Sequence, residues 1–143
     1  MRYFEKGKIG RVITIHMSKG DLVLESIKDV IEKANIKNAV LVSGIGTTSR
    51  TVFHRVLTTG FPPEEDFITL DGPVELSAVQ GLVIDGNPHF HFVFSTLDQT
   101  YSGHLEPGCV TLYLMEVVLV ELLDYDLTRE KDENGIAYVT EKK

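Results

Sequence analysis

Residues 10–46 read GRVITIHMSKGDLVLESIKDVIEKANIKNAVLVSGIG, and the hydrophobic period changes twice along this stretch. The first part alternates apolar and polar residues, and its apolar side is made by Ile13, Ile15 and Met17. Alternation of this kind is typical of a β-strand. The next part has apolar residues at three- and four-residue spacing with charges between them. That spacing predicts an amphipathic helix over about residues 21–35.

Both ends of the predicted helix carry residues that suit helix termini. Asp21 is expected to cap the start, because its carboxylate can accept a hydrogen bond from a free backbone N–H. Asn35 is expected to end the helix in the left-handed conformation. The segment AVLVSGIG at 39–46 is a continuous apolar run that ends in glycines. Such a run indicates a strand that is buried on both faces.

The remainder of the chain contains strand-like segments and no second helical pattern. These segments cover residues 50–57, 72–86, 89–96, 100–105 and 110–123, and the polar stretch 58–67 between the first two reads as an exposed loop. Gly81 within 72–86 is expected to mark a bulge or bend. One strand, one helix and then many strands predict a single α+β domain over 1–143, with a largely antiparallel or mixed sheet. The tail from about 128 to 143, which contains an Asn-Gly pair, predicts either a terminal hairpin or a frayed end.

The charge and cysteine content limit the classes of partner. The net charge is −7, and basic residues outnumber acidic ones only within the first twenty residues. Duplex DNA is normally bound through clustered Lys and Arg side chains, so the charge argues against a DNA partner. Cys109 is the only cysteine, which excludes an internal disulfide, and we expect it to be a small buried apolar residue. With neither a secretory signal pattern nor a membrane-spanning run, a soluble cytoplasmic protein without a membrane partner is expected.

The segment GNPHFHFVF at 86–94 places two histidines in an apolar strand. Residues two apart on a strand project from the same face, so His89 and His91 should stand side by side. Imidazole nitrogens are favoured zinc ligands, and two of them in this position suggest part of a metal site. The alternative is a pair of structural histidines that only form hydrogen bonds.

A third histidine follows in SGHLEPG at 102–108. A hairpin loop centred between Asp98 and Gln99 would place residue 93 opposite His104. His104 would then share the face of the first two histidines and lie diagonally across from His91. Three histidines with water in the fourth position predict an open, catalytic type of zinc site rather than a closed structural one.

Three glutamates and two more histidines complete the candidates. Glu75 and Glu116 are candidate acid/base groups or acceptors for a ligand imidazole, and the alternative for Glu116 is a charge at a subunit interface or in solvent. Glu106 shares the face of His104, where we expect a charge at the rim of the site rather than a ligand. His16 and His54 have no companions at ligand spacing, and we interpret both as ordinary strand or surface residues.

The histidine segments together resemble a known family. PHFHFVFS, followed by SGHLEPGCV and EVVLVEL, resembles the plant-and-prokaryote-conserved (PPC) domain in its stand-alone prokaryotic form, and the resemblance extends over nearly the whole chain. It implies an α+β homotrimer that holds a metal, expected to be zinc, through His89, His91 and His104. The family's glutamates correspond to Glu75 and Glu116. The plant members' basic AT-hook has no counterpart here, so the DNA-binding label of prokaryotic relatives does not transfer directly. The fold also looks like that of acetolactate decarboxylase, in which a three-histidine zinc site polarises a keto acid.

The sequence therefore predicts a metal-binding homotrimer whose metal has an open position for a small carbonyl or carboxylate ligand. Whether it catalyses a reaction is left open; if it does, a metal-dependent lyase or hydrolase is expected. The alternative is a non-enzymatic regulatory module that binds DNA or a protein partner.

Overall fold

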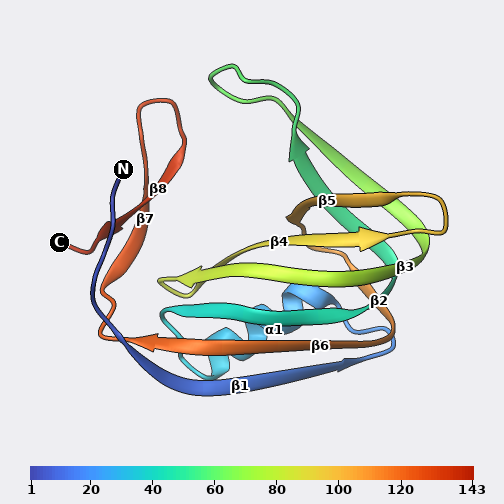
Figure 1. Ribbon diagram of the computed structural model, residues 1–143, viewed down its shortest axis with the longest axis horizontal. Helices are drawn as coiled ribbons and strands as arrows, with labels where there is room; N and C mark the ends of the chain where they lie inside the picture. Colours follow the sequence, from blue (N-terminus) through green and yellow to red (C-terminus); the bar gives the residue numbers. More distant parts are fainter.

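The computed structural model describes residues 1–143 as one helix and eight strands (Figure 1). In chain order the elements are β1 (Lys8–Ser18), α1 (Val23–Lys33), β2 (Ala39–Val56), β3 (Glu65–Ile84), β4 (Asn87–Ser95), β5 (Thr100–Leu105), β6 (Val110–Leu123), β7 (Leu127–Lys131) and β8 (Ala137–Glu141). Helix α1, with 11 residues, is too short to span a bilayer.

Six strands form one antiparallel sheet in the order β1-β6-β2-β3-β4-β5. Strand β5 also pairs with the far end of β2, so the sheet closes on itself at one end. The last two strands, β7 and β8, form a separate hairpin. The chain is therefore an α+β domain with a mostly antiparallel sheet and one helix, as predicted.

Helix α1 is shorter than the sequence pattern predicted. It begins after an N-cap at Leu22, and the expected capping role of Asp21 is wrong. The Asp21 carboxylate instead accepts a hydrogen bond from the backbone N–H of Ser18 at 2.8 Å, which holds the turn between β1 and α1. Asn35 ends the helix as predicted, with φ of 52° in the left-handed region.

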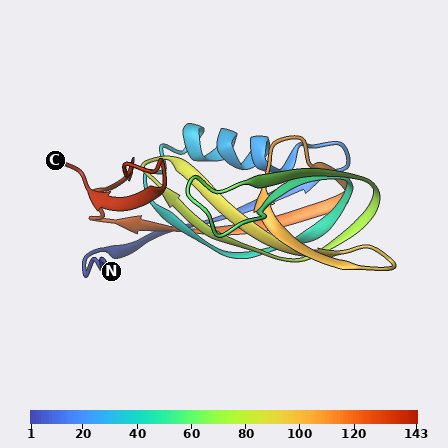
Figure 2. The ribbon, with the colours of Figure 1, turned by 90° about the horizontal axis from the view of Figure 1, so that it is seen from above.

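Strand β2 differs from its prediction in length and in burial. Segments 39–46 and 50–57 are largely one continuous strand, because the glycines at its centre stay extended in the sheet. The prediction of burial on both faces is wrong, since Val42 is 56% exposed and Ile45 47% exposed. The physical reason is that α1 covers one face of the sheet, while no other element of the chain covers the opposite face (Figure 2).

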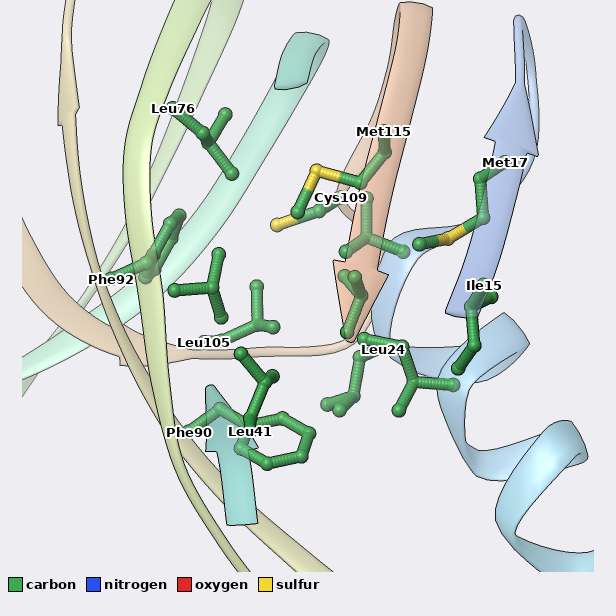
Figure 3. Packing of buried hydrophobic residues seen from close by; sticks show 14 of the residues in the cluster. Ile15, Met17, Leu24, Leu41, Leu76, Phe90, Phe92, Leu105, Cys109 and Met115 are labelled. Carbon is green, nitrogen blue, oxygen red and sulfur yellow. The ribbon is translucent and has the colours of Figure 1, made fainter. Parts of the chain in front are cut away.

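The core lies between α1 and the covered face of the sheet, and it continues into the closed end (Figures 2 and 3). Phe53 of β2 is fully buried and packs edge-on against Phe94 of β4, with ring centroids 5.1 Å apart. Cys109 is buried as predicted, and burial raises the pKa of its thiol to about 11.

Two local predictions for turns and bends have different outcomes. The irregularity in β3 lies between Leu76 and Ala78, so the predicted bulge at Gly81 is misplaced. Gly81 instead has φ of 146°, and a Cβ at this position would collide with the carbonyl oxygen of His89. The tail forms the terminal hairpin rather than a frayed end, with its turn around Gly135.

Candidate metal centre

The hairpin of β4 and β5 carries three of the chain's histidines. His91 lies directly opposite His104, and Ser95 opposite Thr100, so the loop spans residues 96–99. The predicted register was wrong by two positions, because the loop turns one residue earlier than expected. Its length is still even, and His104 therefore shares the face of His89 and His91 as predicted.

Four imidazoles gather on this face rather than three. The Nε2 atoms of His89 and His91 lie 3.2 Å apart, and the ring of His104 lies 4.9 Å and 5.4 Å from theirs, measured between centroids. His54 of β2 lies opposite His104 and stacks on it at 4.5 Å. The interpretation of His54 as an ordinary residue is therefore wrong. Its companions come from the pairing of β5 with β2, which local spacing does not reveal.

Glu106 joins two of these histidines and is not a rim charge. Its Oε1 lies 2.9 Å from Nδ1 of His104 and 2.6 Å from Nδ1 of His54. Its side chain is only 20% exposed. Donor atoms of His54, His104 and Glu106 all lie within 4.8 Å of one another, which is close enough to hold a metal ion. The spacing of Glu106 two residues after His104 was the sequence signal for this contact.

The pKa values of His89, His91 and His104 are lowered, which favours the neutral form that binds metals. Burial, followed by the positive charges of His104 and Arg129, lowers the pKa of His89 to about 4. Burial also lowers the pKa of His91 and of His104, and Glu106 opposes part of the effect at His104. Neutral imidazoles are ready to act as ligands without first losing a proton.

The side chains gathered here are of the types that bind zinc. Imidazole nitrogens and a carboxylate are the ligands of open zinc sites. When the Nδ1–H of His104 donates a hydrogen bond to Glu106, Nε2 of that ring is left with a free lone pair. A carboxylate partner of this kind orients a ligating imidazole and raises its basicity. The donor atoms of His54, His104 and Glu106 lie close enough together to share a metal ion. His89 and His91 lie beside the same His104, with their ring centroids 4.9 Å and 5.4 Å from its ring.

The other two glutamates named from the sequence lie elsewhere on the open face. Glu75 is exposed and pairs with Thr47 and Ser95, four residues along β4 from His91, or about 13 Å at the usual strand rise. Glu116 is also exposed and faces His16 across β1 and β6, with 3.9 Å between His16 Nδ1 and the carboxylate. The structure does not bring either carboxylate to the histidine cluster within one chain.

Two hollows in the surface border the cluster. One, of about 510 Å³, has walls that include His54, His91, His104, Gln80 and Ser102. The other, of about 330 Å³, lies between the sheet and the terminal hairpin, with walls that include His89, His91, Leu82, Arg129 and Tyr138. Nothing local in the sequence connects Arg129 with residue 89, 40 positions earlier.

Solved structures similar to this chain share the whole fold. A plant- and prokaryote-conserved (PPC) protein of Pyrococcus horikoshii aligns with a TM-score of 0.83 and 28% identity, covering 99% of each chain. A metal-containing protein of Archaeoglobus fulgidus aligns with a TM-score of 0.80 and 22% identity over 94% of this chain and 95% of its own. A candidate DNA-binding protein of Bacteroides thetaiotaomicron has a TM-score of 0.78 and 15% identity over 94% and 96% of the two chains.

Among curated proteins, the bifunctional protein GlmU of a Synechococcus strain is 24% identical over 123 residues. Those residues make up 85% of this chain but 19% of the relative, so the chain spans about a fifth of the length of the curated relatives that it matches. The model of one domain family matches residues 4–123, from the segment before β1 to the end of β6. The chain therefore belongs to the Plants and Prokaryotes Conserved (PCC) domain family, as its histidine segments predicted.

Proposed function

We propose that this protein binds one zinc ion per chain through His89, His91 and His104, and that the site takes a small carbonyl or carboxylate ligand. The observation that carries the proposal is the hydrogen bond between Nδ1 of His104 and Glu106, which leaves Nε2 of His104 free on the face of the other two imidazoles. A protein from Archaeoglobus fulgidus with the same fold is metal-containing, which supports a metal in a protein of this fold.

Zinc held by three protein ligands has an open position and acts as a Lewis acid on a carbonyl or carboxylate oxygen. The residues around the site would hold the ligands in place. Glu106 fixes the orientation of His104, and His54 covers one side of that ring. If a reaction takes place here, the donor set suits a metal-dependent lyase or hydrolase.

We further propose that the protein works as a homotrimer, through the open face of the sheet. Exposed apolar side chains on this face include Val12, Val42, Ile45 and Leu114. Apolar side chains gathered on one face commonly mark an interface between proteins. Glu75 and Glu116 would act as acid/base groups only where a neighbouring subunit brings them to the histidines, since they lie away from the cluster of their own chain.

The alternative function is a regulatory module that binds DNA or a protein partner. The DNA version draws on the candidate DNA-binding protein with this fold. The net charge of −7 opposes it, because binding to duplex DNA depends on neutralising its phosphates. Failure to bind a mixed-sequence duplex at low ionic strength would remove this version.

The test of the zinc site is metal analysis of protein purified without an affinity tag. The expected result is about one zinc per chain, lost in His89→Ala and His91→Ala and kept in His16→Ala, whose imidazole lies on β1 away from the cluster. Wild-type protein without zinc would end the proposal. Zinc retained in His89→Ala but lost in His54→Ala would assign the metal to His54, His104 and Glu106 instead.

A further inference from the structure

The hollow between the sheet and the terminal hairpin combines a metal-ligand candidate with a cationic side chain. Its volume is about 330 Å³, at the lower end of the range for small-molecule sites. His89 and His91 form part of one wall, and Arg129 of β7 extends into the same space. Apolar surface comes from β8, through Ala137, Tyr138 and Val139. The hollow thus joins β3 and β4 to the terminal hairpin, which lies more than 30 residues further along the chain.

Arg129 is partly buried and has no carboxylate partner. Its Nη1 donates to the carbonyl oxygen of Asn87 at 2.9 Å and its Nη2 to that of Leu82 at 3.4 Å. No ion pair of the chain includes Arg129. These two bonds anchor the guanidinium, and its remaining N–H groups have no acceptor in the protein. A guanidinium removed from water without a counter-charge is costly, so an anion in the hollow would stabilise it.

The neighbouring residues hold the walls of the hollow in position. The hydroxyl of Tyr138 donates to Glu130 at 2.8 Å, which fixes the ring at the edge of the hollow. The guanidinium carbon of Arg2 lies 4.0 Å above the same ring and adds a second positive charge nearby. The hairpin therefore supplies both the cation and an ordered apolar surface next to it.

We propose that this hollow binds a small organic carboxylate, with its carboxylate group on Arg129 and its far end toward His89. The role of the far end rests on the zinc site proposed above, because that end would then lie beside the metal, whereas the contact with Arg129 needs no metal. A planar guanidinium matches a carboxylate with two parallel hydrogen bonds. The apolar surface of β8 would contact the carbon skeleton. Arg129 would thus select acids over neutral carbonyl compounds of the same size.

The experiment measures binding of pyruvate and of its neutral amide by calorimetry, in zinc-loaded and in metal-free protein. Pyruvate should bind the wild type, and the amide should bind at least about tenfold more weakly. Arg129→Gln should weaken pyruvate binding by a similar factor. Arg129→Lys keeps the positive charge but loses the planar guanidinium, so its affinity for pyruvate should lie between those of the wild type and Arg129→Gln. Arg50→Gln is the matched control, because Arg50 is exposed and paired with Asp71 at 3.5 Å.

Thermal unfolding and zinc content of each variant separate this proposal from the zinc site. Both Arg129 variants should keep the zinc content of the wild type and should melt cooperatively, with Arg129→Gln at a lower temperature because it loses the hydrogen bonds to Asn87 and Leu82. Wild-type protein that binds no pyruvate, or Arg129→Gln protein that binds it unchanged, would overturn the carboxylate site while leaving the zinc site intact. Pyruvate bound through Arg129 in a wild type that holds no zinc would reject the zinc site alone. If inorganic phosphate binds the same site more tightly than pyruvate and displaces it, the assignment to a carboxylate ligand would be overturned.

Discussion

His54 and His104 lie directly opposite each other across β2 and β5, with their rings stacked at 4.5 Å and a single oxygen of Glu106 between their Nδ1 atoms. The two histidines are fifty residues apart in the chain, and the closure of the sheet brings them together. Because Glu106 contacts both rings, replacing this carboxylate should change the orientation and basicity of His104 while leaving the three proposed histidine ligands in place.

Replacing Glu106 by Gln should weaken zinc binding by about 10–100-fold, the usual effect of removing a carboxylate that orients a ligating imidazole. The amide can still accept a hydrogen bond but lacks the charge that makes the imidazole more basic. Competition with a chromophoric chelator measures the affinity. Glu32→Gln, an exposed helix change, is the control and should have no effect. A decrease in zinc affinity of more than a thousandfold would instead indicate that Glu106 is itself a zinc ligand.

Replacing Gly103 by Ala should both destabilise the fold and disturb the site. A Cβ at residue 103 would come within 2.7 Å of the His54 carbonyl oxygen and of the Phe53 ring. The contact would force β5 away from β2 at a cost of about 1–3 kcal/mol in the free energy of unfolding. His104 would move with β5, so zinc affinity should fall as well.

Gly60→Ala is the matched control for this change, because its nearest neighbour would be 3.7 Å away. Urea denaturation and the chelator assay measure the two effects. A Gly103→Ala protein as stable as Gly60→Ala would show that β5 is not held tightly on β2.

Acidification should destabilise the metal-free protein. The folded-state pKa of His89 is about 4, mainly because burial disfavours the charged imidazole, whereas an unfolded histidine titrates near about 6.5. Between these values the unfolded chain binds a proton that the folded chain does not. The free energy of unfolding should therefore decrease as the pH falls from about 7 to about 4, and this contribution should then level off.

Urea midpoints at pH 7 and pH 5 measure this effect, with His89→Gln for comparison. The variant lacks the titrating ring, so the difference between its two midpoints should be smaller than in the wild type. An equal difference in both proteins would assign the pH dependence to other groups.

Replacing Ile45 by Glu should break the proposed trimer. Ile45 is 47% exposed on the open face of the sheet, and a carboxylate buried in an interface there would be left unpaired. Sedimentation equilibrium should give a trimer for the wild type and a smaller species for the variant. Leu97→Glu, in the loop after β4, is the control, since Leu97 is 97% exposed. A monomeric wild type would contradict the proposal directly.

Local pattern was sufficient for most elements of this protein. Alternation predicted the bounds of β5 and β6 and the shared face of His89 and His91, because side chains on a strand repeat every two residues whatever the strand pairs with. Helical spacing predicted α1 to within two residues at each end, and the left-handed Asn35 marked its end. Periodicity depends only on residues that are close together in the chain, so it can be recognised in a segment without knowing what that segment packs against.

The partners of these elements were settled only in three dimensions. His54 and Glu106 reach His104 because β5 pairs with β2, and Arg129 reaches His89 because the terminal hairpin folds against the sheet. These contacts depend on sheet curvature and on the pairing of distant strands, to which many residues contribute small free energies. The sequence by itself therefore determined which side chains share a strand face. The tertiary structure decided which faces meet, because that choice depends on packing across the whole fold.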